Sequence, residues 1–164
     1  MEIFRGTSAQ MLEIWDGRFE DFVDSHVSAV DSGVQECWLM RDEENGKLMG
    51  ELHVLWDKPD DPDYADGKEK AYLMAFRIHE EYQGKGYGTM LMKRVLERIR
   101  ERGFTKATIG ADDYDPKLQP MYQKWGFTRV IKRDFFDYHY DGRLVTCTFT
   151  LLENSCLAAP APSK

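Results

Sequence analysis

The chain has 164 residues, a length typical of one domain with one hydrophobic core. Its formal net charge of −7 argues against general nucleic-acid affinity and favours the attraction of cations. No apolar run approaches the roughly 20 residues of a membrane span, and the N-terminus lacks the basic start and apolar stretch of a signal peptide. We therefore expect a soluble cytoplasmic protein that binds neither nucleic acid nor membrane.

The cysteines argue against a disulfide framework and against a zinc site. Cys37, Cys147 and Cys156 are odd in number, widely separated and without histidines at metal-binding spacing. Cys37 and Cys147 lie in strand-like runs, where free cysteine is usually a small buried apolar residue. We expect both to be reduced and buried, and we expect no metal.

The first third of the chain predicts a short strand at Glu2–Phe4, followed by two helices or one broken helix. Thr7 or Ser8 can cap the first helical turn, and Gly17 interrupts the helical pattern. Apolar residues then continue at helical spacing as far as Gly33. These helices precede the first strands of the predicted sheet.

A hairpin follows, with strands at Glu36–Arg41 and Leu48–Trp56 around a polar turn. The next segment, Asp57–Lys70, has two prolines and five aspartates and nothing to bury, so it predicts a loop. Its aspartates either attract a basic substrate or simply keep a surface loop in water, and the second interpretation is the simpler one.

The central stretch predicts a strand at Ala71–Ile78, a glycine loop at Gln83–Gly88 and a helix that ends at Gly103. The start of such a helix leaves several backbone N–H groups unpaired and carries the positive end of the helix dipole. A junction of this kind predicts a phosphate-binding site.

The remainder predicts a strand at Lys106–Ala111, a short helix at Leu118–Trp125 and two last strands at Phe127–Arg133 and Arg143–Leu152. A turn is expected at Asp141-Gly142, and Ser155–Lys164 predicts a disordered tail. The order of elements indicates one α+β domain over residues 1–154, with strands of both directions in the sheet and helices packed on it.

The spacing of the glycine loop excludes two common nucleotide motifs. A Walker A loop needs Ser or Thr after its lysine, but Lys85 is followed by Gly86. A dinucleotide fingerprint starting at Gly84 would place its third glycine where Thr89 stands. A general nucleotide-phosphate binder is therefore disfavoured, and the pattern that fits is Gln-x-x-Gly-x-Gly.

With that pattern, Ile78–Thr89 resembles the signature of the GNAT superfamily of acetyl-CoA-dependent N-acetyltransferases. Glu80 stands where many members have proline. A second match lies downstream, where Tyr122, Gly126 and Phe127 reproduce the Tyr-x-x-x-Gly-Phe pattern at the end of a short helix. The resemblance implies a central mixed, mostly antiparallel sheet with helices on both faces.

The resemblance also implies the activity. The acetyl group of acetyl-CoA would pass to a primary amine of a small molecule or peptide, cationic amines included. The amine would attack directly in a ternary complex, with CoA as co-product. We expect a monomer or a homodimer, since dimers are common in the family and nothing in the sequence demands one. It implies that the strand end and the loop hold the cofactor, with these residues: Phe76, Arg77, Ile78, Gln83, Gly84, Lys85, Gly86, Tyr87, Gly88 and Thr89.

Of two further positions, Asp115 departs from the family pattern and Tyr122 follows it. Asp115 stands where many members have an asparagine that contacts the cofactor, and aspartate has no amide donor; capping the next helix is its alternative role. Tyr122 matches the family's general acid, since a phenol has a pKa suited to protonating the leaving thiolate.

The general base stays open, because the strand before the loop carries no carboxylate. We take Glu51 on the preceding strand as the candidate. The alternatives are a chain of waters or one of these side chains: His79, Glu80, Asp112 and Asp113. The missing strand carboxylate and Asp115 also leave room for a non-catalytic acyl-CoA-binding or sensing domain of the same fold.

Overall fold

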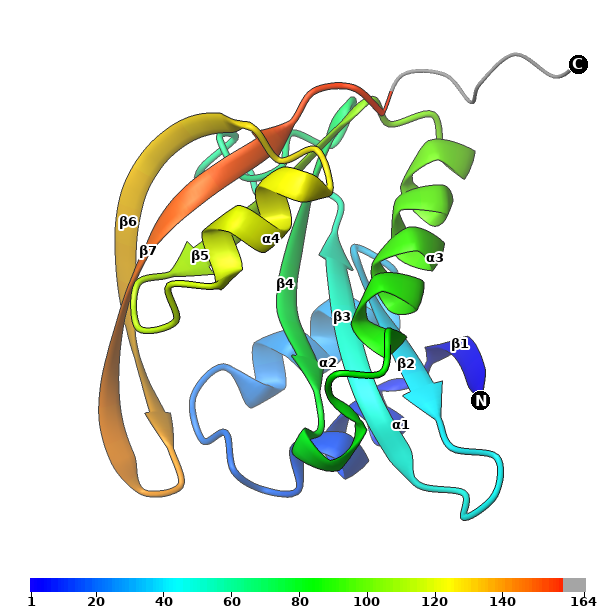
Figure 1. Ribbon diagram of the computed structural model, residues 1–164. Coiled ribbons are helices and arrows are strands. Elements are labelled where there is room, and N and C mark those ends of the chain that lie inside the picture. The colour runs from blue at the N-terminus through cyan, green and yellow to red at the C-terminus, as the bar shows by residue number, and fades with distance from the viewer. Residues whose placement is uncertain (158–164) are drawn as a thin grey trace, which may run out of the picture.

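The computed structural model describes residues 1–157. Their strands form one seven-stranded sheet (Figure 1). Its strand order is β1-β2-β3-β4-β5-β7-β6, and every neighbouring pair is antiparallel except β4 with β5. The strands are β1 Glu2–Gly6, β2 Gln35–Arg41, β3 Leu48–Leu55, β4 Lys70–Ile78, β5 Lys106–Asp112, β6 Arg129–Tyr140 and β7 Arg143–Asn154. This confirms the predicted mixed, mostly antiparallel sheet.

Helices cover both faces of the sheet, as predicted. The helices α1 Ser8–Trp15 and α2 Val23–Ser32 pack on one face, with Cys37 and Leu39 of β2 beneath them. The helices α3 Tyr87–Glu101 and α4 Leu118–Lys124 pack on the other (Figure 1). A short 3-10 helix, Glu80–Tyr82, joins β4 to the glycine loop.

The helix α3 is held on the sheet by an apolar stripe and by one buried ion pair. Leu91, Val95 and Ile99 are buried against the sheet at the predicted helical spacing. Arg98 donates to both carboxylate oxygens of Glu36 at 3.0 and 2.8 Å, and only 1% of the surface of Glu36 is exposed. The apolar stripe thus packs α3 on the sheet, and the ion pair ties its last turn to β2.

The last hairpin is longer than the sequence predicted. The strand β6 runs to Tyr140, well beyond the predicted end at Arg133, because its residues stay paired with β7 as far as the turn. The turn lies at Asp141-Gly142 as expected, and both residues have positive φ, 52° and 76°. The polar residues between Arg133 and Tyr140 hid this part of the strand, since they do not alternate cleanly with apolar ones.

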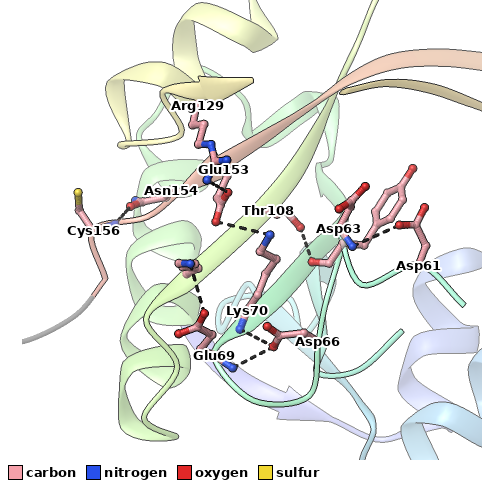
Figure 2. Close-up of polar contacts among 12 residues, drawn as sticks. Asp61, Asp63, Asp66, Glu69, Lys70, Thr108, Arg129, Glu153, Asn154 and Cys156 are labelled. Atoms are coloured by element: carbon pink, nitrogen blue, oxygen red, sulfur yellow. Dashed lines mark hydrogen bonds and ion pairs between the residues drawn. The ribbon is translucent and has the colours of Figure 1, made fainter. Parts of the chain in front are cut away.

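The loop between β3 and β4 ties its aspartates into its own structure (Figure 2). Asp66 accepts three hydrogen bonds, each at 2.9 Å, from the backbone N–H groups of residues 68–70. Lys132 of β6 contacts Asp61 and Asp63 at 2.6 and 3.2 Å. Because these carboxylates have partners within the chain, the loop fits the simpler interpretation, a solvated structural loop.

The end of the described chain is ordered. The side chain of Leu157 is buried, and its N–H donates to the carbonyl of Thr105 at 3.1 Å. The rest of the predicted tail, residues 158–164, lies outside the described residues. Cys37 and Cys147 are buried and free, as predicted. No helix between residues 1 and 157 combines the length and the apolar character that crossing a membrane would require.

Candidate active site

The two central strands diverge and leave a V-shaped opening in the sheet. β4 and β5 pair from Lys70 with Lys106 to Leu73 with Ile109, and their pairing stops there. Beyond that point β4 stays with β3, and β5 stays with β7 as far as Asp112. The last residues of β4 therefore present a backbone edge that β5 does not use, and such an edge can pair with an extended ligand as an added strand would.

A bulge in β4 sets which side chains face each side of this opening. Ala75 has a φ of 55°, and the pairing with β3 shifts between Glu51 and His53. Because of the extra residue, Met74 and Arg77 both lie on the α1–α2 face, while Phe76 lies on the α3–α4 face. A left-handed alanine costs about 1–2 kcal/mol, and strain of this kind is typical of functional sites.

The glycine loop leaves a concave backbone surface at the start of α3. Gly84 and Gly86 have φ values of 74° and 86°, and a Cβ placed on either would meet no atom within 4 Å. Among residues 1–157, no backbone carbonyl accepts from the N–H groups of residues 84–86, and the first N–H groups of α3 are free by helix geometry. This loop fits an anionic pyrophosphate, because its unpaired donors lie at the positive end of α3.

Other predicted cofactor residues support the shape of the loop. The Gln83 amide donates to the carbonyl of Ile78 at 2.8 Å and so ties the loop to the end of β4. A Cβ on Gly88 would lie 3.3 Å from Phe76, so this glycine allows α3 to approach β4 closely and has no positive φ. Lys85 contacts the carbonyl of Glu81 at 3.4 Å, and Tyr87 packs edge-on against Tyr82.

Tyr122 lies on α4 and is only 4% exposed. Its ring packs among Phe76, Trp125 and Phe127, with centroid distances of 6.1 to 6.4 Å. Burial raises the pKa of Tyr122 well above its usual value, and the negative charge of Asp112 raises it further. A phenol is protonated at neutral pH even without this shift, so Tyr122 carries the proton that a general acid needs.

Glu51, the predicted base, is 1% exposed and fully engaged. One carboxylate oxygen accepts from Trp15 Nε1 and contacts His53 Nε2, both at 2.8 Å; the other accepts from Arg77. Burial alone would raise the pKa of Glu51, but the hydrogen bond with His53 and the charges of His53 and Arg77 lower it. A carboxylate with hydrogen-bond partners on both oxygens and a lowered pKa is a poor proton acceptor.

The aspartates after Ala111 have three different surroundings. Asp113 pairs with Arg133 and accepts from Thr148 at 2.8 Å. Asp115 accepts from the N–H of Lys117 at 3.0 Å, so it shapes the turn before α4; it does not cap that helix, whose N-cap is Lys117 without a side-chain hydrogen bond. Asp112 accepts from the thiol of Cys147 at 3.0 Å. All three aspartates line a surface hollow of about 400 Å³ beside α4.

An arch that the sequence did not predict spans the α1–α2 face. The loop between α1 and α2 is bonded to the tip of the β6–β7 hairpin, which runs toward that loop in Figure 1. Asp21 accepts from the backbone N–H of His139 at 2.6 Å and contacts its ring Nδ1 at 2.7 Å. Phe19 packs on Tyr140 with ring centroids 5.0 Å apart. These residues are far apart in sequence, and no local pattern marks them as partners.

The comparisons with known proteins agree with this arrangement. Residues 8–127 match the sequence model described as "Acetyltransferase (GNAT) family". A segment of 70 residues is 31% identical to the uncharacterized N-acetyltransferase YvbK of Bacillus subtilis (strain 168). That segment covers 42% of this chain and 45% of YvbK, so the match spans less than half of that relative.

Two solved structures show the same fold. A GNAT family acetyltransferase from Elizabethkingia anophelis with acetyl-CoA bound is 18% identical, with a TM-score of 0.61 over 94% of this chain and 97% of that one. The spermidine/spermine N-acetyltransferase SpeG from Vibrio cholerae is 14% identical, with a TM-score of 0.65 over 93% and 90%.

Proposed function

The chain belongs to the GNAT acetyltransferase family, and we propose that it transfers the acetyl group of acetyl-CoA to a primary amine of a small molecule or peptide. Acetyl-CoA is the cofactor, and CoA is the co-product. The amine attacks the thioester directly while donor and acceptor are bound together. The observation that carries this proposal is the V between β4 and β5, with the open glycine loop at one end of β4 and Tyr122 beside Phe76.

The donor binds along the free edge of β4 and over the start of α3. The backbone of residues 76–78 holds the amide-bearing arm, and the N–H groups of residues 83–89 hold the pyrophosphate. Gly86 supports this role because its positive φ aims the loop without a side chain in the way. Lys85 lies at the same loop and supplies positive charge.

Tyr122 supplies the proton that the leaving thiolate needs. The phenol is protonated at neutral pH, and its packing against Phe76 supports this role because Phe76 lies at the bulged end of β4. Proton transfer by a positioned side chain typically contributes about 10²–10⁴-fold to a rate. Bound in this way, acetyl-CoA supplies the activated acyl group, and this chain orients it and handles the protons.

The test is a panel of primary amines incubated with acetyl-CoA, with release of the free thiol as the readout. We expect thiol release above the acetyl-CoA hydrolysis rate for at least one amine. A protein that binds acetyl-CoA but releases no thiol with any amine would instead be the non-catalytic acyl-CoA-binding domain.

A further inference from the structure

We propose that Asp112 is a catalytic residue of this site: its carboxylate binds the ammonium group of the acceptor and removes the proton that blocks attack. The proposal rests on the proposed acetyl transfer to an amine. It assigns the base to β5, on the arm of the V opposite the strand that holds the donor.

Asp112 stands where an acceptor must arrive. It is the last residue of β5, beyond Ile109, where the pairing with β4 ends. Ala111 is buried with α3 and α4, so alternation along the strand turns Asp112 to the opposite face of the sheet. Tyr122 is packed on the α3–α4 face. The acid and the proposed base therefore approach the V from its two sides.

Asp112 also lacks the cation that the other buried carboxylates have. Glu36 pairs with Arg98, Glu51 with Arg77, and Glu153 with Lys70 and Arg129, and each of these three glutamates is at most 1% exposed. Asp112 is half-buried, and among residues 1–157 its side-chain hydrogen bonds come from neutral donors, the weak thiol donor of Cys147 and the hydroxyl of Tyr114. A partly desolvated carboxylate without a cation is unfavourable, and the ammonium group of an acceptor supplies that cation.

The groups around Asp112 suit both binding and proton removal. Four tyrosines lie near enough to be affected by its charge: Tyr72 of β4, Tyr122 of α4, Tyr138 of β6 and Tyr114 in the loop before α4. The negative charges of Asp113 and Asp115 also lie beside it. Aromatic rings stabilise a nearby ammonium through cation–π attraction. Burial raises the pKa of Asp112, and the two neighbouring aspartates add to this, while Cys147 and Tyr114 oppose it. A carboxyl with a raised pKa is the better base near neutral pH.

The protons balance with these two residues. Asp112 takes one proton from R–NH3⁺, and the free amine forms a C–N bond to the acetyl carbon while the C–S bond breaks. Tyr122 gives its proton to the leaving sulfur and regains one from the new amide nitrogen. The proton on Asp112 leaves to solvent through the hollow of about 400 Å³ that it lines. The products are the acetamide, CoA and one proton.

The rival carboxylates are less suitable. Both oxygens of Glu51 are occupied by donors from Trp15, His53 and Arg77. Asp113 is held by Arg133 and Thr148, and its pKa is lowered to about 2 by the hydrogen bonds from these two residues. Asp113 thus provides a matched control beside Asp112 in the sequence.

The experiment compares Asp112→Asn with Asp113→Asn, using the amine that the wild type acetylates fastest. We expect kcat/KM of Asp112→Asn to fall about 100-fold or more, with loss of the acidic limb of its pH profile and an unchanged acetyl-CoA dissociation constant. Asp113→Asn should stay within about tenfold of wild type and keep the acidic limb, moved to lower pH because Asp113 is one of the two charges that raise the pKa of Asp112. A folded Asp112→Asn protein with wild-type kcat/KM and the same acidic limb would overturn the proposal.

Two further measurements test the proposal even if Asp112→Asn does not fold or the wild type acetylates no amine. In the wild type, the acidic limb should stay at one pH for n-butylamine and the less basic 2-methoxyethylamine; a limb that follows the basicity of the amine would contradict an enzymatic base. If the wild type acetylates no amine, the proposed function fails, and binding of 1,4-diaminobutane to the CoA complex becomes the readout. Asp112→Asn should weaken that binding about tenfold, and equal binding would overturn the assignment.

Discussion

The guanidinium of Arg77 contacts one carboxylate oxygen of Glu51 through two nitrogens: Nε donates a hydrogen bond at 3.0 Å, and Nη2 forms an ion-pair contact at 2.8 Å. Nη2 of Arg77 donates a hydrogen bond to the carbonyl of Ile14 in α1 at 3.0 Å. Trp15 completes the link by donating to Glu51 from α1. Because Arg77 follows the bulge at Ala75, this pair fixes the end of β4 to β3 and to α1.

We therefore predict that replacing Glu51 changes the free energy of unfolding more than it changes the rate of acetyl transfer. Replacing Glu51 with Gln removes a buried charge that two cationic side chains face, and breaking such a pair costs about 3 kcal/mol. Urea unfolding measures this loss, and kcat of the folded protein should stay within about tenfold of wild type. A variant that keeps its stability but loses all turnover would restore Glu51 as the base.

The same carboxylate predicts how stability depends on pH. The pKa of Glu51 is lowered in the folded protein from its ordinary value of 4.5. Its stabilising contribution is therefore fully present above about pH 4.5 and is lost as pH falls through the folded pKa. Urea midpoints measured from pH 7 downward should fall more steeply in wild type than in Glu51→Gln. Parallel curves would show that other groups carry the acid sensitivity.

Tyr122→Phe is predicted to reduce kcat about 100-fold while the acetyl-CoA dissociation constant stays the same. The ring and its packing among Phe76 and Phe127 are kept, so only the proton donor is lost. Steady-state kinetics and direct titration with acetyl-CoA separate the two effects. Unchanged kcat would assign the proton to another group.

Gly86→Ala is predicted to weaken acetyl-CoA binding about tenfold, because a Cβ enters the loop surface that faces the pyrophosphate. Gly103→Ala is the matched control: its φ is 80°, a Cβ there also meets open space, and it lies at the far end of α3. Both variants should lose about 1–2 kcal/mol of stability from the positive φ. Equal acetyl-CoA affinity in the two variants would place the donor elsewhere.

The sequence predicted most elements of the fold because their signals are local. Gln83, Gly86 and the downstream Gly126-Phe127 are spaced by the geometry of one strand–loop–helix unit and one short helix, and those spacings are readable along the chain. The role of Gly88 was predicted in part, since its closeness to Phe76 depends on how α3 packs.

The site beyond the donor loop depends on contacts that no local pattern encodes. Glu51 stands 36 residues from Trp15 and 26 from Arg77, and the partners of Asp21 lie 118 residues away. In sequence, nothing distinguishes Glu51, on a predicted strand, from Asp112 and Asp113, which directly follow one. Only burial and partners separate them: Glu51 and Asp113 pair with arginines, whereas Asp112 has no ion pair among residues 1–157.

The most direct test of acetyl transfer follows both products in one reaction of the wild-type protein with acetyl-CoA and a primary amine. The account predicts that free CoA thiol and N-acetylated amine form in equal amounts, and that omission of the amine leaves only background hydrolysis. Thiol release without acetylated amine, or tight acetyl-CoA binding with neither product for any amine, would contradict it.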